Sequence, residues 1–296
     1  MKNVIYNYYN ILLTDINESN DNYYFYYNSN LYVFYLIENN PETINEIYNF
    51  LIENNIDSYK IIANKDNNLI TTINNKNYAL LHLKGLLKYE IKFEEFKYYP
   101  INKQNHNWGT LWSNKLDYYE IQIRELGKKY QTLLNSFGFF KGIAENAILY
   151  YNLTEKKFND EVPVAIVHNR MNYPEYEKDY NNPLNFVIDY YIRDISEYIK
   201  SYTISDYYNL ENIITLINKL TLNSKSFNLL YSRLLYPTFY FDEYDKIILG
   251  REEDNKIINV INKIQNYLEM LKKIFIVFNN KYEMFNIEWL NKNVEN

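Results

Sequence analysis

The sequence of 296 residues contains no cysteine. Disulfide bonds and thiolate metal sites are therefore excluded, and the composition fits a reducing compartment. Glycine and proline number only 6 each, whereas Asn, Ile, Lys and Tyr are abundant. We interpret this skew as drift toward AT-rich codons. The 35 tyrosines are accordingly read as ordinary amphipathic side chains rather than as a cross-linking or stacking device.

Basic clusters and long apolar runs are also missing. The formal net charge is −6, and no basic patch recurs at a spacing that would follow phosphates, so nucleic acid is not expected as a partner. The first 15 residues lack the apolar core and cleavage site of a secretory signal. The apolar run Ile274–Phe278 is far too short to cross a bilayer. We expect a soluble protein that stays in the cell that makes it.

The first 38 residues read as strands, and a helix and further strands follow. The turn signal Asn28-Ser29-Asn30 favours a hairpin, and Pro41-Glu42 opens a helix that Asn54 and Asn55 end. Aromatic and β-branched runs predict strands at 22–27, 31–37, 60–63 and 77–83, with 69–73 as a further candidate. This order predicts a small β-rich lobe with one helix, residues 1–84.

Past Gly85 the pattern becomes helical. Apolar residues at helical spacing predict a long helix over 117–137, which Gly138 would end, and a second helix over 143–151. Further helices are expected near 193–203, 208–222, 224–234, 238–248 and 254–278. A β-rich lobe and a helical lobe of residues 85–296, joined near 83–87 with Gly85 in the hinge, is the layout of a bilobal protein-kinase-like fold of the α+β class.

One hairpin in the helical lobe, within residues 163–202, carries the candidate site. Two apolar runs, Val164–Val167 and Phe186–Ile188, end directly on His168 and Asp189. Two buried strands that deliver polar groups to the same end are a common way for a rigid scaffold to present a site. A hairpin without any function could end in the same two residues.

This hairpin resembles the aminoglycoside/choline-kinase branch of the kinase-like fold. That branch carries His-Gly-Asp, then an Asn, then a strand ending in Ile-Asp. His168 takes the His position, Val187-Ile188-Asp189 matches the strand with its metal-binding Asp, and Asp194-Ile195 resembles the structural Asp-Leu of the next helix.

Longer segments are similar to the spore coat kinase-like family (the CotS/YutH group). The matching segments are residues 112–120, 142–148, 193–198 and 233–241. They cover most of the helical lobe, whereas the small lobe matches only by its order of elements. The resemblance implies a kinase-like fold and a sporulation context.

Phosphoryl transfer requires a phosphate cradle, a cation, magnesium and a carboxylate that orients the acceptor. The cradle normally uses glycine, but no glycine precedes Gly85. The strand Leu31–Ile37 contains no Lys or Arg. Glu42 or Glu46 would be the usual partner of that cation, although a solvated helix face explains both glutamates equally well. The small lobe therefore lacks the nucleotide-binding parts that the fold implies.

The catalytic positions of the hairpin are also altered. Arg170 stands two residues after His168, where the resemblance implies the catalytic Asp, and a guanidinium cannot accept a proton. Glu175 stands where the second metal ligand would be an Asn. Asp189 alone remains, and one carboxylate is a poor magnesium site unless a nucleotide supplies phosphates. We expect no catalytic residue at the degenerate positions His168, Arg170 and Glu175.

Structural roles are expected for these residues instead. His168 would pack beneath the loop and make one backbone hydrogen bond, and Asp189 would form a buried ion pair with Arg170. The leading hypothesis is a catalytically inactive kinase-like protein without a cofactor. It would act as a binding or scaffold component with other coat or coat-assembly proteins, in the mother-cell cytoplasm or in the spore coat.

Two alternatives stay open. The chain could be an active phosphotransferase for a small molecule or a protein, dependent on ATP and Mg, with Glu175, Asp189 and Asp179 as relocated catalytic residues. It could also be a purely structural cytosolic protein.

Overall fold

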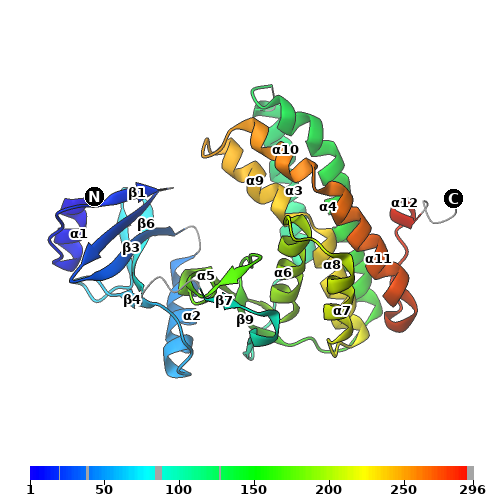
Figure 1. The fold of residues 1–296 in the computed structure, drawn as a ribbon, viewed down its shortest axis with the longest axis horizontal. Coiled ribbons are helices and arrows are strands. Elements are labelled where there is room, and N and C mark those ends of the chain that lie inside the picture. The colour runs from blue at the N-terminus through cyan, green and yellow to red at the C-terminus, as the bar shows by residue number, and fades with distance from the viewer. Residues whose placement is uncertain (20, 38–39, 84–88, 127, 292–296) are drawn as a thin grey trace. The chain divides into compact units, whose positions relative to one another are not determined.

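The computed structural model describes residues 1–19, 21–37, 40–83, 89–126 and 128–291, and they form two compact units (Figure 1). The sheet unit comprises residues 1–98, 166–169 and 174–188, and the helical unit comprises residues 99–165, 170–173 and 189–296. The predicted hinge at Gly85 lies outside the described residues.

An antiparallel six-stranded sheet organises the sheet unit. Its strands are β1 (Asn17–Ser19), β2 (Asn22–Tyr27), β3 (Asn30–Ile37), β4 (Lys60–Ile62), β5 (Ile70–Ile73) and β6 (Lys76–Leu83). They follow the order β1-β2-β3-β6-β4, and β5 also pairs with β6. Tyr27 pairs with Asn30, so only Asn28 and Ser29 form the turn, both with positive φ (48° and 63°). The predicted strands and hairpin are confirmed.

One helix covers each face of this sheet. Helix α2 (Pro41–Glu53) begins where the Asn40 side chain accepts a hydrogen bond from the Glu42 amide, at 2.9 Å. Its apolar residues pack with Val33, whereas the next residue of β3, Phe34, packs with the helix α1 (Lys2–Tyr9). Successive residues of a strand point to opposite faces, so the two helices cover opposite faces.

Helix α1 corrects the prediction that the whole of residues 1–38 forms strands. The segment is rich in Tyr, Ile and Val, which favour strands, but Ile5 is fully buried against Phe25 and Phe34. Packing of one apolar stripe on the sheet therefore outweighs local propensity. The helix ends at Asn10, whose φ of 56° is left-handed.

The hairpin and residues 90–100 contain short elements. They are β7 (Glu90–Ile91), η1 (Phe93–Glu95), β8 (Tyr99–Pro100), β9 (Val164–His168), β10 (Glu175–Tyr176), α5 (Glu177–Tyr180), η2 (Pro183–Asn185) and β11 (Phe186–Tyr190). Strand β10 pairs with β7, and the predicted hairpin strands form a three-stranded sheet in the order β11-β9-β8.

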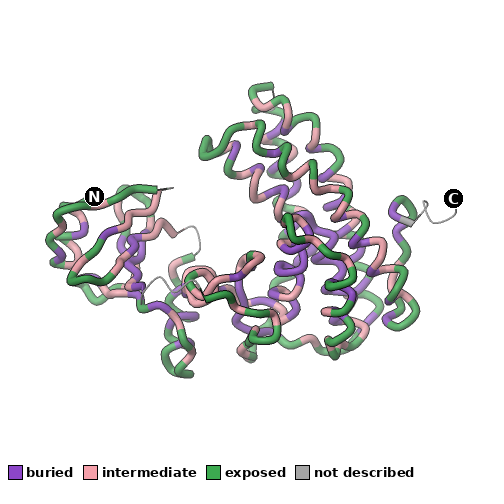
Figure 2. Tube along the Cα trace, in the orientation of Figure 1, coloured by how far each residue is buried: buried purple, intermediate pink, exposed green. Residues whose placement is uncertain are grey.

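The helical unit is built around α8. Its elements are α3 (Trp108–Leu126), α4 (Gln131–Lys157), α6 (Ile192–Ile204), α7 (Leu210–Asn218), α8 (Ser224–Leu235), α9 (Thr238–Ile248), η3 (Asp254–Lys256), α10 (Ile257–Ile261), α11 (Ile264–Tyr282) and α12 (Glu288–Asn291). Helix α8 packs against α4, α6 and α11. Figure 2 shows that buried residues gather along α6 and α8.

Several helix boundaries differ from the prediction. The predicted helix over 117–137 is wrong, since α3 ends at Leu126 and α4 begins at Gln131, and the helix predicted over 143–151 is part of α4. Gly138 does not end a helix, because α4 continues through it with one buried face on both sides, including Phe137 and Phe140. The α4 N-terminus is instead capped from far along the chain: Asp254 accepts hydrogen bonds from the amides of Thr132 and Leu133 at 2.8 and 3.0 Å. The single helix predicted over 254–278 is interrupted, since α10 ends at Ile261 and α11 begins at Ile264.

Candidate functional site

The hairpin strands are antiparallel and hold their polar residues apart. The Asn169 amide donates to the Asn185 carbonyl at 2.6 Å, and the Tyr191 amide donates to the Pro163 carbonyl at 3.1 Å. In this register His168 lies beside the start of β11, while Asp189 lies opposite the start of β9. The prediction that both residues reach the same end is therefore wrong.

His168 lies buried in the sheet unit beneath the loop. Its Nε2 is 2.8 Å from the carbonyl oxygen of Tyr180. A carbonyl can only accept, so the proton lies on Nε2. The ring also contacts the rings of Tyr180 and Phe186, with centroids 4.5 and 4.4 Å away. The backbone hydrogen bond expected for His168 is present, and the ring holds α5 and the start of β11 together.

Glu175 is also buried in the sheet unit, with 0% of its surface exposed. It lies on β10, where its backbone pairs with Ile91 of β7. Nowhere in the described part of the chain do three His, Cys, Asp or Glu side chains gather in an arrangement that would hold a metal ion. Glu175, at the position of the second metal ligand, is thus a buried residue of a small two-stranded sheet.

Asp189 is the centre of a buried hydrogen-bond cluster in the helical unit. Its Oδ1 accepts from the side-chain amide of Asn105, the indole of Trp108 and the amide of Tyr190, each at 2.8 Å. Its Oδ2 accepts from Arg193 at 2.6 Å, and Arg233 lies 3.8 Å away. Burial alone would raise the pKa of Asp189, but the two guanidinium groups outweigh it and lower the pKa.

Arg170 contacts Asp242 of α9 rather than Asp189. Its Nη2 donates to Asp242 Oδ1 at 2.6 Å, and its Nε lies 4.0 Å from Glu197. Burial would lower the pKa of Arg170, but the Asp242 carboxylate outweighs it and raises the pKa. The predicted ion pair between Arg170 and Asp189 is wrong, because the side chain of Asp189 is already surrounded by Arg193 and Arg233.

Glu197 links these two groups of charges. It is 3% exposed and lies 2.8 Å from Lys200 Nζ and 3.0 Å from Arg233 Nε. Lys200 also donates to Thr238 Oγ1 at 2.7 Å. Burial would raise the pKa of Glu197, but Lys200, Arg233 and Arg170 together lower it. The chain of contacts runs from Asp242 through Arg170, Glu197 and Arg233 to Asp189.

Burial lowers the pKa of two basic side chains in this network, Lys200 and Arg233. Burial lowers the pKa of Lys200 to about 7, although Glu197 opposes the shift. Burial and the neighbouring Arg193 lower the pKa of Arg233 to about 10. Sequence reasoning missed the network. The one local signal was the spacing of Arg193, Glu197 and Lys200, which places charged groups on one face of α6.

Strand β3 and helix α2 hold the positions at which the resemblance implies a phosphate-binding cation and its glutamate partner. Residues Val33, Tyr35 and Ile37 of β3 face the core shared with α2, and the strand NLYVFYLI carries no Lys or Arg. Glu42 and Glu46 are exposed on α2. The face that would present a cation to phosphates is therefore an apolar surface with one tyrosine.

The sequence matches one known family over most of its length. The family model described as "Spore coat putative kinase YutH" matches residues 2–275. The chain belongs to this YutH family. One curated relative, the "Endospore coat-associated protein YutH" of Bacillus subtilis (strain 168), is 25% identical over 213 residues, which is 62% of this chain and 61% of the relative. The chain thus matches less than two thirds of that relative's length.

Solved structures show the fold of this YutH-family chain. An aminoglycoside phosphotransferase from Alicyclobacillus acidocaldarius superposes with a TM-score of 0.51 at 6% identity, covering 91% of this chain and 92% of its own. The AMP-bound spectinomycin phosphotransferase superposes with a TM-score of 0.50 at 11% identity, covering 91% and 93%. The predicted kinase-like fold is confirmed. Within the described residues, no helix combines the length and apolar character needed to cross a membrane.

Proposed function

We propose that this YutH-family chain is a kinase-like protein that no longer transfers phosphate and serves as a binding or scaffold component of the spore coat. The coat context is supported by the B. subtilis relative, an endospore coat-associated protein. The loss of transfer is supported by three features of the chain, each within one unit.

The observation that carries the proposal is the surrounding of Asp189. Both carboxylate oxygens already accept hydrogen bonds, from three neutral donors and from Arg193, with Arg233 close by. Magnesium requires oxygen ligands at about 2.0–2.1 Å in near-ideal octahedral geometry. A divalent cation at Asp189 would have to displace those donors and lie against two guanidinium groups. Asp189, the one residue that remains of the metal-binding set, therefore neutralises the charges of Arg193 and Arg233.

Arg170 supplies the second feature. A kinase orients its acceptor hydroxyl with a carboxylate that takes the proton. Here a guanidinium occupies that position and is neutralised by Asp242 and Glu197. An arginine cannot act as the base, because its pKa lies far above physiological pH and is raised further by Asp242.

The sheet unit supplies the third feature. Both ends of the β2–β3 turn are held by pairing of Tyr27 with Asn30, which leaves two residues to curl around phosphates, neither of them glycine. The adjoining strand β3 offers no basic side chain. Nucleotide phosphates would find neither a glycine-rich cradle nor a cation there.

A thermal-shift titration with ATP and MgCl2 tests the loss of nucleotide chemistry. We expect an unaltered melting temperature at millimolar ligand, because only a ligand that binds the folded state raises stability. The spectinomycin phosphotransferase is the matched positive control for the fold. A magnesium-dependent rise in this chain would overturn the proposal and favour the alternative, an active phosphotransferase.

The scaffold role needs a separate assay. Purified protein is added to coat layers isolated from spores that lack it, and the bound fraction is measured after sedimentation. We expect saturable binding that ATP does not change. Binding that fails to saturate, or none at all, would contradict a scaffold role while leaving the nucleotide result intact.

A further inference from the structure

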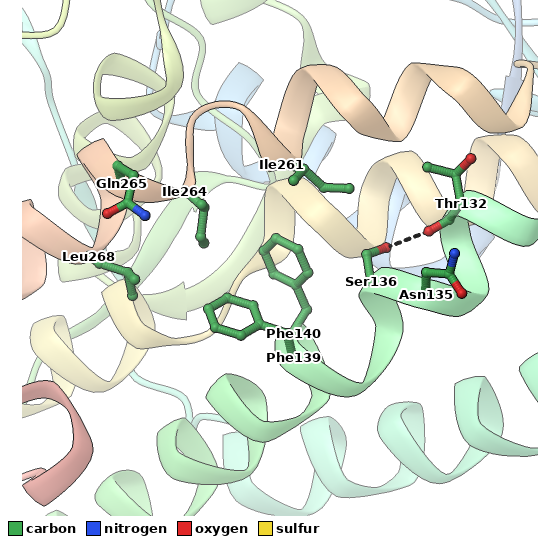
Figure 3. Close-up of a pocket in the computed structure, with 9 residues that line it drawn as sticks. All are labelled: Thr132, Asn135, Ser136, Phe139, Phe140, Ile261, Ile264, Gln265 and Leu268. Atoms are coloured by element: carbon green, nitrogen blue, oxygen red, sulfur yellow. Dashed lines mark hydrogen bonds between the residues drawn. The ribbon is translucent and has the colours of Figure 1, made fainter.

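The helical unit contains an apolar pocket of about 380 Å³, and none of its lining residues belongs to the charged network (Figure 3). One wall is the first half of α4, from which Phe139 and Phe140 extend. The facing wall comes from the end of α10, with Ile261, and from the start of α11, with Ile264 and Leu268. The break that interrupts the predicted helix thus creates one side of the pocket.

The side chains that line the pocket are all uncharged. Apart from the five apolar residues, the pocket is lined by uncharged polar side chains, and no charged side chain among the described residues takes part. Asn135 and Gln265 are exposed, so they lie toward solvent, where one of them can hydrogen-bond a ligand. A charged ligand would lose its hydration here without gaining a partner. The lining therefore selects an uncharged molecule.

The half-exposed ring of Phe139 sets the shape of the occupant. Phe140 stacks on Tyr240 with a centroid distance of 3.9 Å, which fixes its ring. Phe139 lies perpendicular to Phe140, at 89° and 5.4 Å, and is 48% exposed. Phe140 is only 2% exposed, so the accessible ring is that of Phe139, against which a flat ligand ring can stack or place its edge, both favourable for aromatic rings.

Polar contacts hold the walls in place. Asp254, directly before α10, caps the first amides of α4. Ser136, which also lines the pocket, lies 3.0 Å from the hydroxyl of Tyr240. The pocket is thus preformed, and its volume falls within the range of about 300–1,000 Å³ that is typical of small-molecule sites.

We propose that this pocket binds a small uncharged molecule made of an aromatic ring with one hydrogen-bonding group, as in a phenol or an indole. This site is independent of the proposed scaffold function and of any nucleotide.

Titration with indole, followed by NMR of the labelled isoleucine methyl groups, tests the proposal on the full chain. We expect saturable shifts at Ile261 and Ile264, with a dissociation constant on the order of 0.1–1 mM for a ligand of this size. Benzoate, which is charged, and cyclohexanol, which is not aromatic, should each bind at least tenfold more weakly. Shifts that never saturate, or equal binding of either comparison compound, would overturn the proposed ligand class.

Matched variants on the same helix locate the site. Phe139→Ala removes a half-exposed ring and should weaken indole binding at least tenfold, whereas Leu149→Ala, at a residue of α4 that is 58% exposed and outside the pocket, should leave binding unchanged. Ile264→Trp fills the pocket from the other wall and should abolish binding. If Phe139→Ala and Ile264→Trp both bind indole like the parent, the pocket is not the site.

Discussion

Removing the charge of Asp189 should destabilise the helical unit strongly. Asp189→Asn keeps the shape of the side chain but leaves Arg193 and Arg233, which are 12% and 4% exposed, without their shared carboxylate. Removing one partner of a buried ion pair costs about 3–5 kcal/mol. Whole domains are stable by only about 5–15 kcal/mol, so a large fraction of the total would be lost.

Urea unfolding followed by tryptophan fluorescence measures this loss. Trp108, Trp112 and Trp289 all lie in the helical unit, so the signal reports on the unit that contains Asp189. Asp206→Asn is the matched control, because Asp206 pairs with Lys263 at the same 2.6 Å but is exposed, and exposed pairs contribute little. A loss below about 1 kcal/mol for Asp189→Asn, or equal losses for both variants, would refute the reasoning.

Three further predictions follow from the same network and from the α4 cap. Arg170→Asp places a third carboxylate beside Asp242 and Glu197. We expect this variant to unfold at a lower urea concentration and still to release no phosphate from ATP. ATP hydrolysis by this variant would contradict the account. Lys200 has a pKa of about 7 when folded but about 10.4 when unfolded. Between pH 7 and 9 the unfolded chain binds more protons, so the unfolding free energy should rise with pH. Lys200→Met should flatten this rise of the unfolding free energy with pH, measured by urea titrations at several pH values. A variant with the same pH dependence as the parent would contradict the assignment to Lys200. Asp254→Ala should lower the unfolding free energy by about 1 kcal/mol while Asp254→Asn loses less, and equal losses would argue against capping.

Elements with strong local signals were predictable from the sequence. The turn at Asn28 and Ser29, the Pro41 helix start and the strands of the small sheet depend on neighbouring residues, and the structure confirms them. Helix α1 and the passage of α4 through Gly138 were not predictable, because both depend on apolar packing against distant elements. The cap on α4 comes from Asp254, more than 100 residues away, so no local pattern indicates it.

Sequence reasoning singled out Arg170 and Asp189 of the candidate site but not their partners. Arg170 stands out because it departs from the family pattern, and Asp189 because it matches that pattern. Their partners Asp242, Arg193 and Arg233 come from three helices, and tertiary packing alone decides which carboxylate meets which guanidinium.

Transfer of labelled phosphate tests the central claim most directly. The pure protein is incubated with ATP labelled at the γ-phosphate, MgCl2 and, as acceptors, aminoglycosides or isolated coat proteins, with the spectinomycin phosphotransferase as positive control. The account predicts no labelled product above the protein-free reaction. A labelled product that forms only when the parent chain is present would contradict it.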